Sequence, residues 1–255
     1  MGKVYLVGAG PGAPDLLTLR AARLLEAADI VLHDALVHPD TLALAKKARL
    51  IDVGKRYGKV STEQRFIHRA LVFAARKYDV VVRLKGGDPM LFGRAQEELE
   101  ALAAAGVEAE VVPGVTAALA AAAQLKVSLT RRGLARTVAF LTPRVGHGET
   151  ASEWLPAALG ADSVALYMAA GAASSIAAAL IDGGKPAATP VALVESATLA
   201  SERRILTTLG ELASEAPPRA DGPVVMLVGE VLRDCETVAL PASEEIPESL
   251  RSIRK

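Results

Sequence analysis

The stretch VRLKGGDP at residues 82–89 leads from a short apolar run into two glycines, an aspartate and a proline. Residues 80–84 are rich in valine, which favours a buried strand, so Gly86 and Gly87 fall at its carboxyl end. Paired glycines let a backbone turn approach a bound molecule closely, and Asp88 adds a carboxylate at the same edge. We therefore expect this turn to border a binding site.

The same arrangement occurs on both sides of this stretch. VYLVGAGPG at residues 4–12 and VVPGVTA at residues 111–117 each read as a strand followed by a glycine-containing turn. Because ligands bind at the carboxyl ends of parallel strands, the three turns should converge on one crevice.

Short apolar runs alternate with helical patterns along most of the chain. In the first half we expect strands at 4–7, 30–32, 49–53, 80–84 and 107–112, with helices at 15–27, 62–77 and 93–105. This order implies an open, largely parallel sheet covered on both faces.

The pattern resumes after Pro113-Gly114. We expect strands at 138–141, 164–167, 191–194 and 224–228, helices at 152–159 and 172–181, and an added strand at 203–206. The fold class is thus α/β, with an N-terminal lobe over 1–113 and a C-terminal lobe with a mixed sheet over 114–233. Residues 234–255 should form a loosely ordered tail.

Composition excludes several kinds of protein. The 255 residues are 51% hydrophobic and 23% charged, as in globular domains. Twenty-nine basic and 29 acidic residues give no positive excess, so we expect no nucleic-acid or membrane partner. One cysteine and four scattered histidines argue against a disulfide or a metal site. The first apolar run is too short for a signal peptide, and no run approaches the roughly 18 apolar residues of a membrane span, so a cytoplasmic protein is expected.

The loop GAGPG at residues 8–12 leaves three interpretations open. The first is a dinucleotide site of an NAD-dependent oxidoreductase, since the loop follows the first strand and Asp34 lies at a suitable distance along the chain to bind the ribose. However, Pro11 has no backbone N–H to offer a pyrophosphate, which favours a ligand without phosphate at this turn. A plain turn with no ligand is the third possibility.

Seven segments in order resemble the tetrapyrrole methylases. They are VYLVGAGPG at 4–12, VGKR at 53–56, VRLKGGDP at 82–89, FGR at 92–94, VVPGVTA at 111–117, LYMA at 166–169 and PVALVESAT at 190–198. The resemblance extends from the first residue to about Val231.

This resemblance implies two lobes with the active-site cleft between them, a homodimer, and S-adenosylmethionine as methyl donor. Matched motif by motif, the donor contacts fall on Pro11, Gly86, Gly87, Asp88, Leu91, Thr116, Ala117, Met168 and Ala197. The catalytic acid/base pair falls on Asp34 and Lys55.

The implied reaction is C-methylation of uroporphyrinogen III through precorrin-1 to precorrin-2, for cobalamin or siroheme biosynthesis. Such a transfer needs aligned reactants rather than a metal. The acceptor's eight carboxylates should face basic groups. Two clusters suit this role, one of Lys55, Arg56 and Lys59 and one of Lys126, Arg131, Arg132 and Arg136; Arg83, Lys85 and Arg94 either contribute or are surface charges.

The motifs expected on the acceptor side depart from the family pattern. Ala95 and Gln96 stand where glycines are common, and Arg131 stands where histidine is common. A methyltransferase acting on a different corrin or porphyrin intermediate therefore stays open, as does a sensor that binds S-adenosylmethionine or a tetrapyrrole without turnover.

Overall fold

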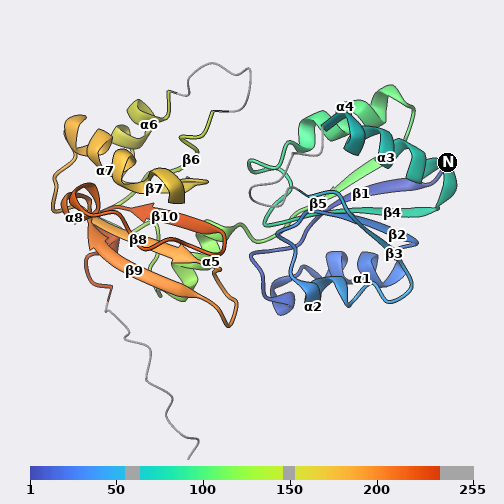
Figure 1. Cartoon of the computed structure of the whole chain (residues 1–255), viewed down its shortest axis with the longest axis horizontal. Coiled ribbons are helices and arrows are strands. Elements are labelled where there is room, and N and C mark those ends of the chain that lie inside the picture. The colour runs from blue at the N-terminus through green and yellow to red at the C-terminus, as the bar shows by residue number, and fades with distance from the viewer. Residues whose placement is uncertain (55–63, 146–152, 236–255) are drawn as a thin grey trace, which may run out of the picture.

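The computed structural model describes residues 1–54, 64–145 and 153–235, and it contains two five-stranded sheets (Figure 1). The first sheet has the order β3-β2-β4-β1-β5, and all its pairings are parallel. Its strands are β1 (Lys3–Gly8), β2 (Ile30–His33), β3 (Arg49–Asp52), β4 (Val80–Lys85) and β5 (Ala109–Val112). The predicted parallel sheet is confirmed.

Helices cover both faces of this sheet. One face carries α1 (Leu19–Ala27) and α2 (Pro39–Leu42), and the other carries α3 (Gln64–Lys77) and α4 (Ala95–Ala104) (Figure 1). Successive side chains of β4 point to opposite faces of the sheet: Val81 packs in the core beneath α3, while Val82 packs in the core beneath α1. Both cores exclude water, which explains the valine run at the start of this strand, whereas Arg83 and Lys85 are its two buried charged residues.

The second sheet is mixed, as predicted. Its order is β6-β7-β10-β8-β9, with β6 parallel to β7 and the other three pairings antiparallel. The strands are β6 (Val138–Leu141), β7 (Ser163–Tyr167), β8 (Pro190–Glu195), β9 (Arg203–Thr208) and β10 (Val224–Val228). The added strand expected at residues 203–206 is β9.

The helices of the second lobe also lie on two faces. One core contains side chains of α6 (Trp154–Gly160), α7 (Ala173–Asp182) and α8 (Leu209–Ser214), and the other contains the small side chains of α5 (Ala117–Gln124). Short 3₁₀ helices are η1 (Pro14–Leu16), η2 (Ala170–Ala172) and η3 (Glu230–Leu232). None of the helices in the described ranges has the length and apolarity to cross a membrane.

The helix expected at residues 15–27 is wrong in its first turn. Residues 14–16 form the separate 3₁₀ helix η1, and α1 begins only at Leu19. It begins there because the Thr18 side chain accepts a hydrogen bond from the backbone N–H of Ala21 at 3.2 Å. This is the usual role of a threonine N-cap.

The lobe boundary at residues 113 and 114 stays a prediction. We propose it there because β5 ends at Val112 and the next helix, α5, packs on the second sheet. Lys55 and residues 236–255 of the predicted tail lie outside the described ranges.

Candidate active site

The three glycine-containing turns meet at the carboxyl edge of the first sheet. Gly10 and Gly87 form an isolated bridge, in which Gly10 N donates to Gly87 O at 3.2 Å and Gly87 N donates to Gly10 O at 2.7 Å. A Cβ atom on Gly114 would lie 2.3 Å from Gly87 O and 2.9 Å from the Cα atom of Gly8. The predicted convergence is therefore confirmed, and its closeness requires the absence of a side chain.

The turn after β4 leaves open space on one side. Gly87 has φ +67°, a conformation that side chains disfavour. A Cβ atom on Gly87 would meet only the Cα atom of Thr116, at 3.9 Å, and one on Gly86 would meet only Leu36, at 3.6 Å. A ligand can thus approach this backbone closely, which fits the donor contacts predicted for Gly86 and Gly87.

Asp88 ties two of the turns together. Its Oδ2 atom accepts a hydrogen bond from Gly114 N at 2.9 Å, and its Oδ1 atom accepts one from Met90 N at 2.8 Å. Leu91 N also donates to the Asp88 carbonyl oxygen, at 3.3 Å. The carboxylate therefore shapes the predicted donor site, a role that the sequence motif did not disclose.

The second lobe contributes strained turns. Met168, at the end of β7, has φ +57°, and Ser196 and Thr198, on either side of Ala197, have φ +50° and +75°. A positive φ is uncommon for residues other than glycine, most of all for a β-branched residue such as Thr198, and such residues cluster at functional sites. Thr198 Oγ1 accepts a hydrogen bond from Ala13 N at 3.0 Å, so the turn after β8 contacts the first glycine loop near Pro11.

Tyr167 holds the start of α5. Its hydroxyl lies 2.6 Å from Thr116 Oγ1 and accepts a hydrogen bond from Ala118 N at 3.2 Å, whereas the Thr116 side chain makes no cap of its own. The ring packs against Phe92 of the first lobe. Burial raises the pKa of the phenol above its usual value, so it stays protonated at neutral pH. Sequence reasoning missed both aromatic residues, although each lies inside a quoted motif.

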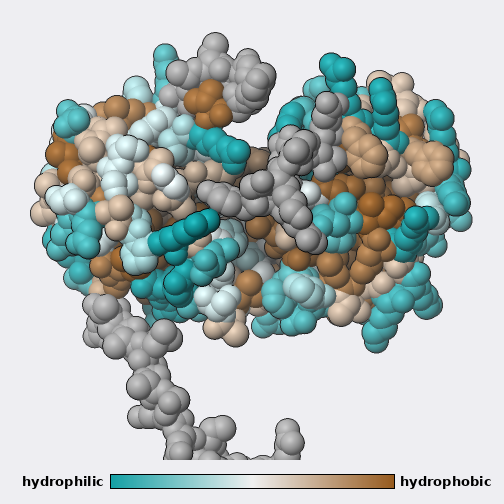
Figure 2. Space-filling view, in the orientation of Figure 1, coloured by the Kyte–Doolittle hydropathy of each residue, from teal (hydrophilic) through white to brown (hydrophobic). Residues whose placement is uncertain are grey.

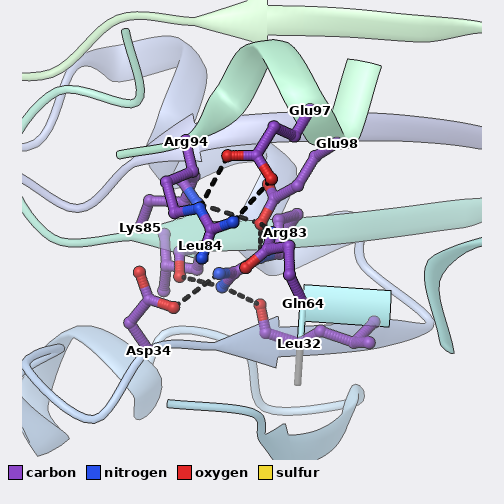
Figure 3. Close-up of polar contacts among 9 residues, drawn as sticks. All are labelled: Leu32, Asp34, Gln64, Arg83, Leu84, Lys85, Arg94, Glu97 and Glu98. Carbon is purple, nitrogen blue, oxygen red and sulfur yellow. Dashed lines mark hydrogen bonds and ion pairs between the residues drawn. The ribbon is translucent and has the colours of Figure 1, made fainter. Parts of the chain in front are cut away.

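Asp34 follows β2 and belongs to an ionic cluster whose other members, Arg83, Lys85 and Glu98, are buried (Figure 3). Arg83 Nη2 lies 2.5 Å from Asp34 Oδ1, and Arg83 Nε lies 3.1 Å from Glu98 Oε1. Lys85 Nζ lies 3.0 Å from the same oxygen of Glu98. Burial, and then the charge of Arg83, lower the pKa of Lys85. The expectation that Arg83 and Lys85 are surface charges or contacts to the acceptor is wrong, because both are buried against carboxylates.

Arg94 differs from these two cations. It is exposed, has φ +55°, and donates to both carboxylate oxygens of Glu97 at 2.6 Å. The hydrogen bond from Arg94 lowers the pKa of Glu97. In the second basic cluster, Arg131 forms an ion pair with Asp234, in which Arg131 Nη1 lies 3.0 Å from Asp234 Oδ2.

The surface is hollowed between the two lobes (Figure 2). Two surface cavities lie elsewhere, one of about 430 Å³ lined by α3 residues such as Phe73 and one of about 280 Å³ lined by residues such as Lys185. Neither is lined by a predicted donor-binding or catalytic residue. The geometry therefore favours an open site between the lobes, bordered by the turns.

Comparison with known proteins agrees with this arrangement. The family model for tetrapyrrole (corrin/porphyrin) methylases matches residues 3–213. The chain is 45% identical over 234 residues to a uroporphyrinogen-III C-methyltransferase of Pseudomonas aeruginosa, covering 91% of this chain and 95% of that protein. It is 44% identical over 235 residues to a siroheme synthase of Azotobacter vinelandii, covering 91% of this chain but only 51% of that protein. The structure of uroporphyrin-III C-methyl transferase from Thermus thermophilus complexed with S-adenyl homocysteine matches with a TM-score of 0.81 and 42% identity, covering 91% of this chain and 99% of that one.

Proposed function

Because this chain belongs to the tetrapyrrole methylase family, we propose that it is a methyltransferase that uses S-adenosylmethionine to methylate two carbon atoms of uroporphyrinogen III. The product is precorrin-2, formed through precorrin-1, which serves cobalamin or siroheme biosynthesis. The observation that carries this function is the convergence of Gly8, Gly87 and Gly114 at one sheet edge, in a chain similar to a structure that contains S-adenyl homocysteine.

The turns of both lobes suit the methyl donor. Gly86 and Gly87 present open backbone, and Asp88 fixes that backbone against the turn after β5. Met168, 47% exposed in a left-handed conformation, and Ala197 lie at strand ends of the second lobe. We assign the donor to this group, together with Pro11, Leu91, Thr116 and Ala117.

The chemistry requires alignment and the removal of a proton. Each transfer breaks the bond between the sulfonium sulfur and the methyl carbon, forms a carbon–carbon bond, and releases S-adenosylhomocysteine and one proton. Holding the reacting atoms about 3–3.5 Å apart supplies much of the rate. The carboxylate of Asp34 accepts the proton, and Lys55 balances charge or returns a proton.

The finer assignments are a homodimer and a cytoplasmic location. Phe66 and Phe73 lie seven residues apart on α3, with 57% and 67% of their surfaces exposed, and pairing with a second copy would bury them. Sedimentation equilibrium tests the dimer. The location remains a prediction from the sequence.

Incubation with methyl-labelled S-adenosylmethionine and enzymatically generated uroporphyrinogen III tests the function. We expect two labels per product molecule and stoichiometric S-adenosylhomocysteine, identified by mass spectrometry. Donor binding without a methylated product would contradict the assignment of uroporphyrinogen III as acceptor. Two alternatives would then remain: a methyltransferase for a different corrin or porphyrin intermediate, or a sensor that binds its ligand without turnover.

Calorimetric titration tests the donor separately. We expect S-adenosylhomocysteine to bind and NAD not to bind, because Pro11 offers no N–H to a pyrophosphate. Tight binding of NAD alone would overturn the methyltransferase in favour of an oxidoreductase.

A further inference from the structure

We propose that Arg83 is the positioning residue for Asp34, and that Glu98 fixes Arg83 in this role. The proposal rests on the proposed function, in which Asp34 accepts a proton from the tetrapyrrole. It assigns a task to the two buried residues, Arg83 and Glu98, on which the orientation of Asp34 depends (Figure 3).

Every nitrogen of the Arg83 guanidinium has a partner. Nη2 donates to Asp34 Oδ1 at 2.5 Å, Nε donates to Glu98 Oε1 at 3.1 Å, and Nη1 lies 3.2 Å from the Leu84 carbonyl oxygen and 3.5 Å from that of Leu32. The group is planar, so partners in three directions fix its position and its orientation. Only 2% of the Arg83 side chain is exposed, and water therefore cannot replace these contacts.

The two oxygens of the Asp34 carboxylate are not equivalent. Oδ1 faces the guanidinium, whereas Oδ2 has no hydrogen-bond partner within the described residues, and 30% of the side chain is exposed. In Figure 3 the second oxygen points away from Arg83. Arg83 thus holds one oxygen and leaves the other, Oδ2, as the atom that accepts the proton.

Glu98 links this carboxylate to the loop after β4. Its Oε1 atom contacts both Arg83 and Lys85. The Lys85 side chain in turn packs against that loop, since a Cβ atom on Gly93 would lie 3.1 Å from Lys85 Cε. The cluster has two cations and two carboxylates, which makes its burial tolerable. Removing the charge of Glu98 would leave two buried cations facing each other and release the guanidinium.

Substitution Arg83→Lys tests the proposal, because lysine keeps the charge but cannot span three directions. We expect kcat for methylation of uroporphyrinogen III to fall about 10- to 100-fold, as for other displaced catalytic groups, with S-adenosylhomocysteine affinity unchanged. Arg20→Lys is the control, since Arg20 contacts Glu110 at the surface of the same lobe, 3.1 Å away. It should keep wild-type kcat.

The double variant Arg83→Lys with Asp34→Asn separates positioning from general support of the fold. If Arg83 acts through Asp34, the double variant should have the kcat of Asp34→Asn alone, because coupled residues are not additive. Additive losses accompanied by weaker S-adenosylhomocysteine binding would overturn the proposal. A wild-type kcat for Asp34→Asn would refute the role of Asp34 itself, and a normal Arg83→Lys beside an impaired Asp34→Asn would refute the positioning role alone.

If Arg83→Lys does not fold, Glu98→Gln gives the same decision. This substitution keeps the shape of the Glu98 side chain and leaves Arg83 unchanged. It should lower kcat by a similar factor, with unchanged S-adenosylhomocysteine affinity. Wild-type kcat in folded Glu98→Gln would reject the proposal.

Discussion

The rings of Phe92 and Tyr167, which come from different lobes, meet with their centroids 5.1 Å apart and their planes at 52°. Tilted contacts of this kind stabilise aromatic pairs beyond the area they bury. Because the Tyr167 hydroxyl also contacts Thr116 and Ala118, this pair connects the loop after β4 with the start of α5. The two sides of the proposed donor site are therefore coupled through one phenol.

Tyr167→Phe should weaken donor binding while leaving the ring contact in place. Loss of the hydroxyl leaves Ala118 N without its acceptor, so we expect the free energy of unfolding to fall by about 1–2 kcal/mol. S-adenosylhomocysteine affinity should fall about fivefold, as measured by calorimetry. Tyr78→Phe is the control, since no hydrogen bond of the Tyr78 hydroxyl occurs among the described residues. Equal behaviour of the two variants would contradict the capping role.

Gly114→Ala should be strongly destabilising. Its Cβ atom would lie 2.3 Å from Gly87 O, and the turns would have to separate. We expect a loss of about 2–3 kcal/mol in denaturant unfolding. Gly160→Ala is the matched control, because nothing lies within 4 Å of the added atom at the end of α6. It should leave stability unchanged or raise it by about 0.5 kcal/mol.

Asp88→Asn should loosen the turn after β4. An amide offers one acceptor oxygen in place of two, so either Gly114 N or Met90 N would face an N–H₂ group. We expect about a tenfold loss of S-adenosylhomocysteine affinity and a fall of about 1–3 kcal/mol in the free energy of unfolding. Asp182→Asn, at the end of α7, should change neither quantity. An unaltered Asp88→Asn variant would show that the tether is dispensable.

Asp162 should make the second lobe sensitive to acid. Its Oδ2 atom accepts hydrogen bonds from Arg136 N and from the backbone and side chain of Thr137, and these lower its pKa below the usual 3.8. Since the folded-state pKa is depressed, the stabilisation is complete above the unfolded-state value and is lost as pH falls through the folded-state value. Thermal unfolding of Asp162→Asn and of wild type from about pH 6 to pH 2 checks this. The difference in midpoint should be largest at pH 6 and shrink below 3.8.

The sequence by itself determined the order of elements and the position of the glycine turns. Valine-rich runs of four to six residues form strands wherever they are buried on both faces, as in β4 and β10. Gly8 and Gly114 are required by backbone contacts that no side chain allows, and Gly87 is favoured by its left-handed backbone conformation, so these positions mark the site in the sequence. Three of the seven motifs that resemble the family lie on these turns, and the candidate donor residues followed from the match to all seven.

Only the tertiary structure decided what the charged and aromatic side chains do. Asp34 and Arg83 are 49 positions apart, and Thr116 and Tyr167 are 51 apart, so no local pattern indicates their contacts. Arg83 and Lys85 resemble surface charges in the sequence, yet the parallel strands bring Glu98 of α4 over them and bury all three. Local propensity and backbone sterics act over a few residues and can be read along the chain, whereas the pairing of buried charges depends on which elements the fold places side by side.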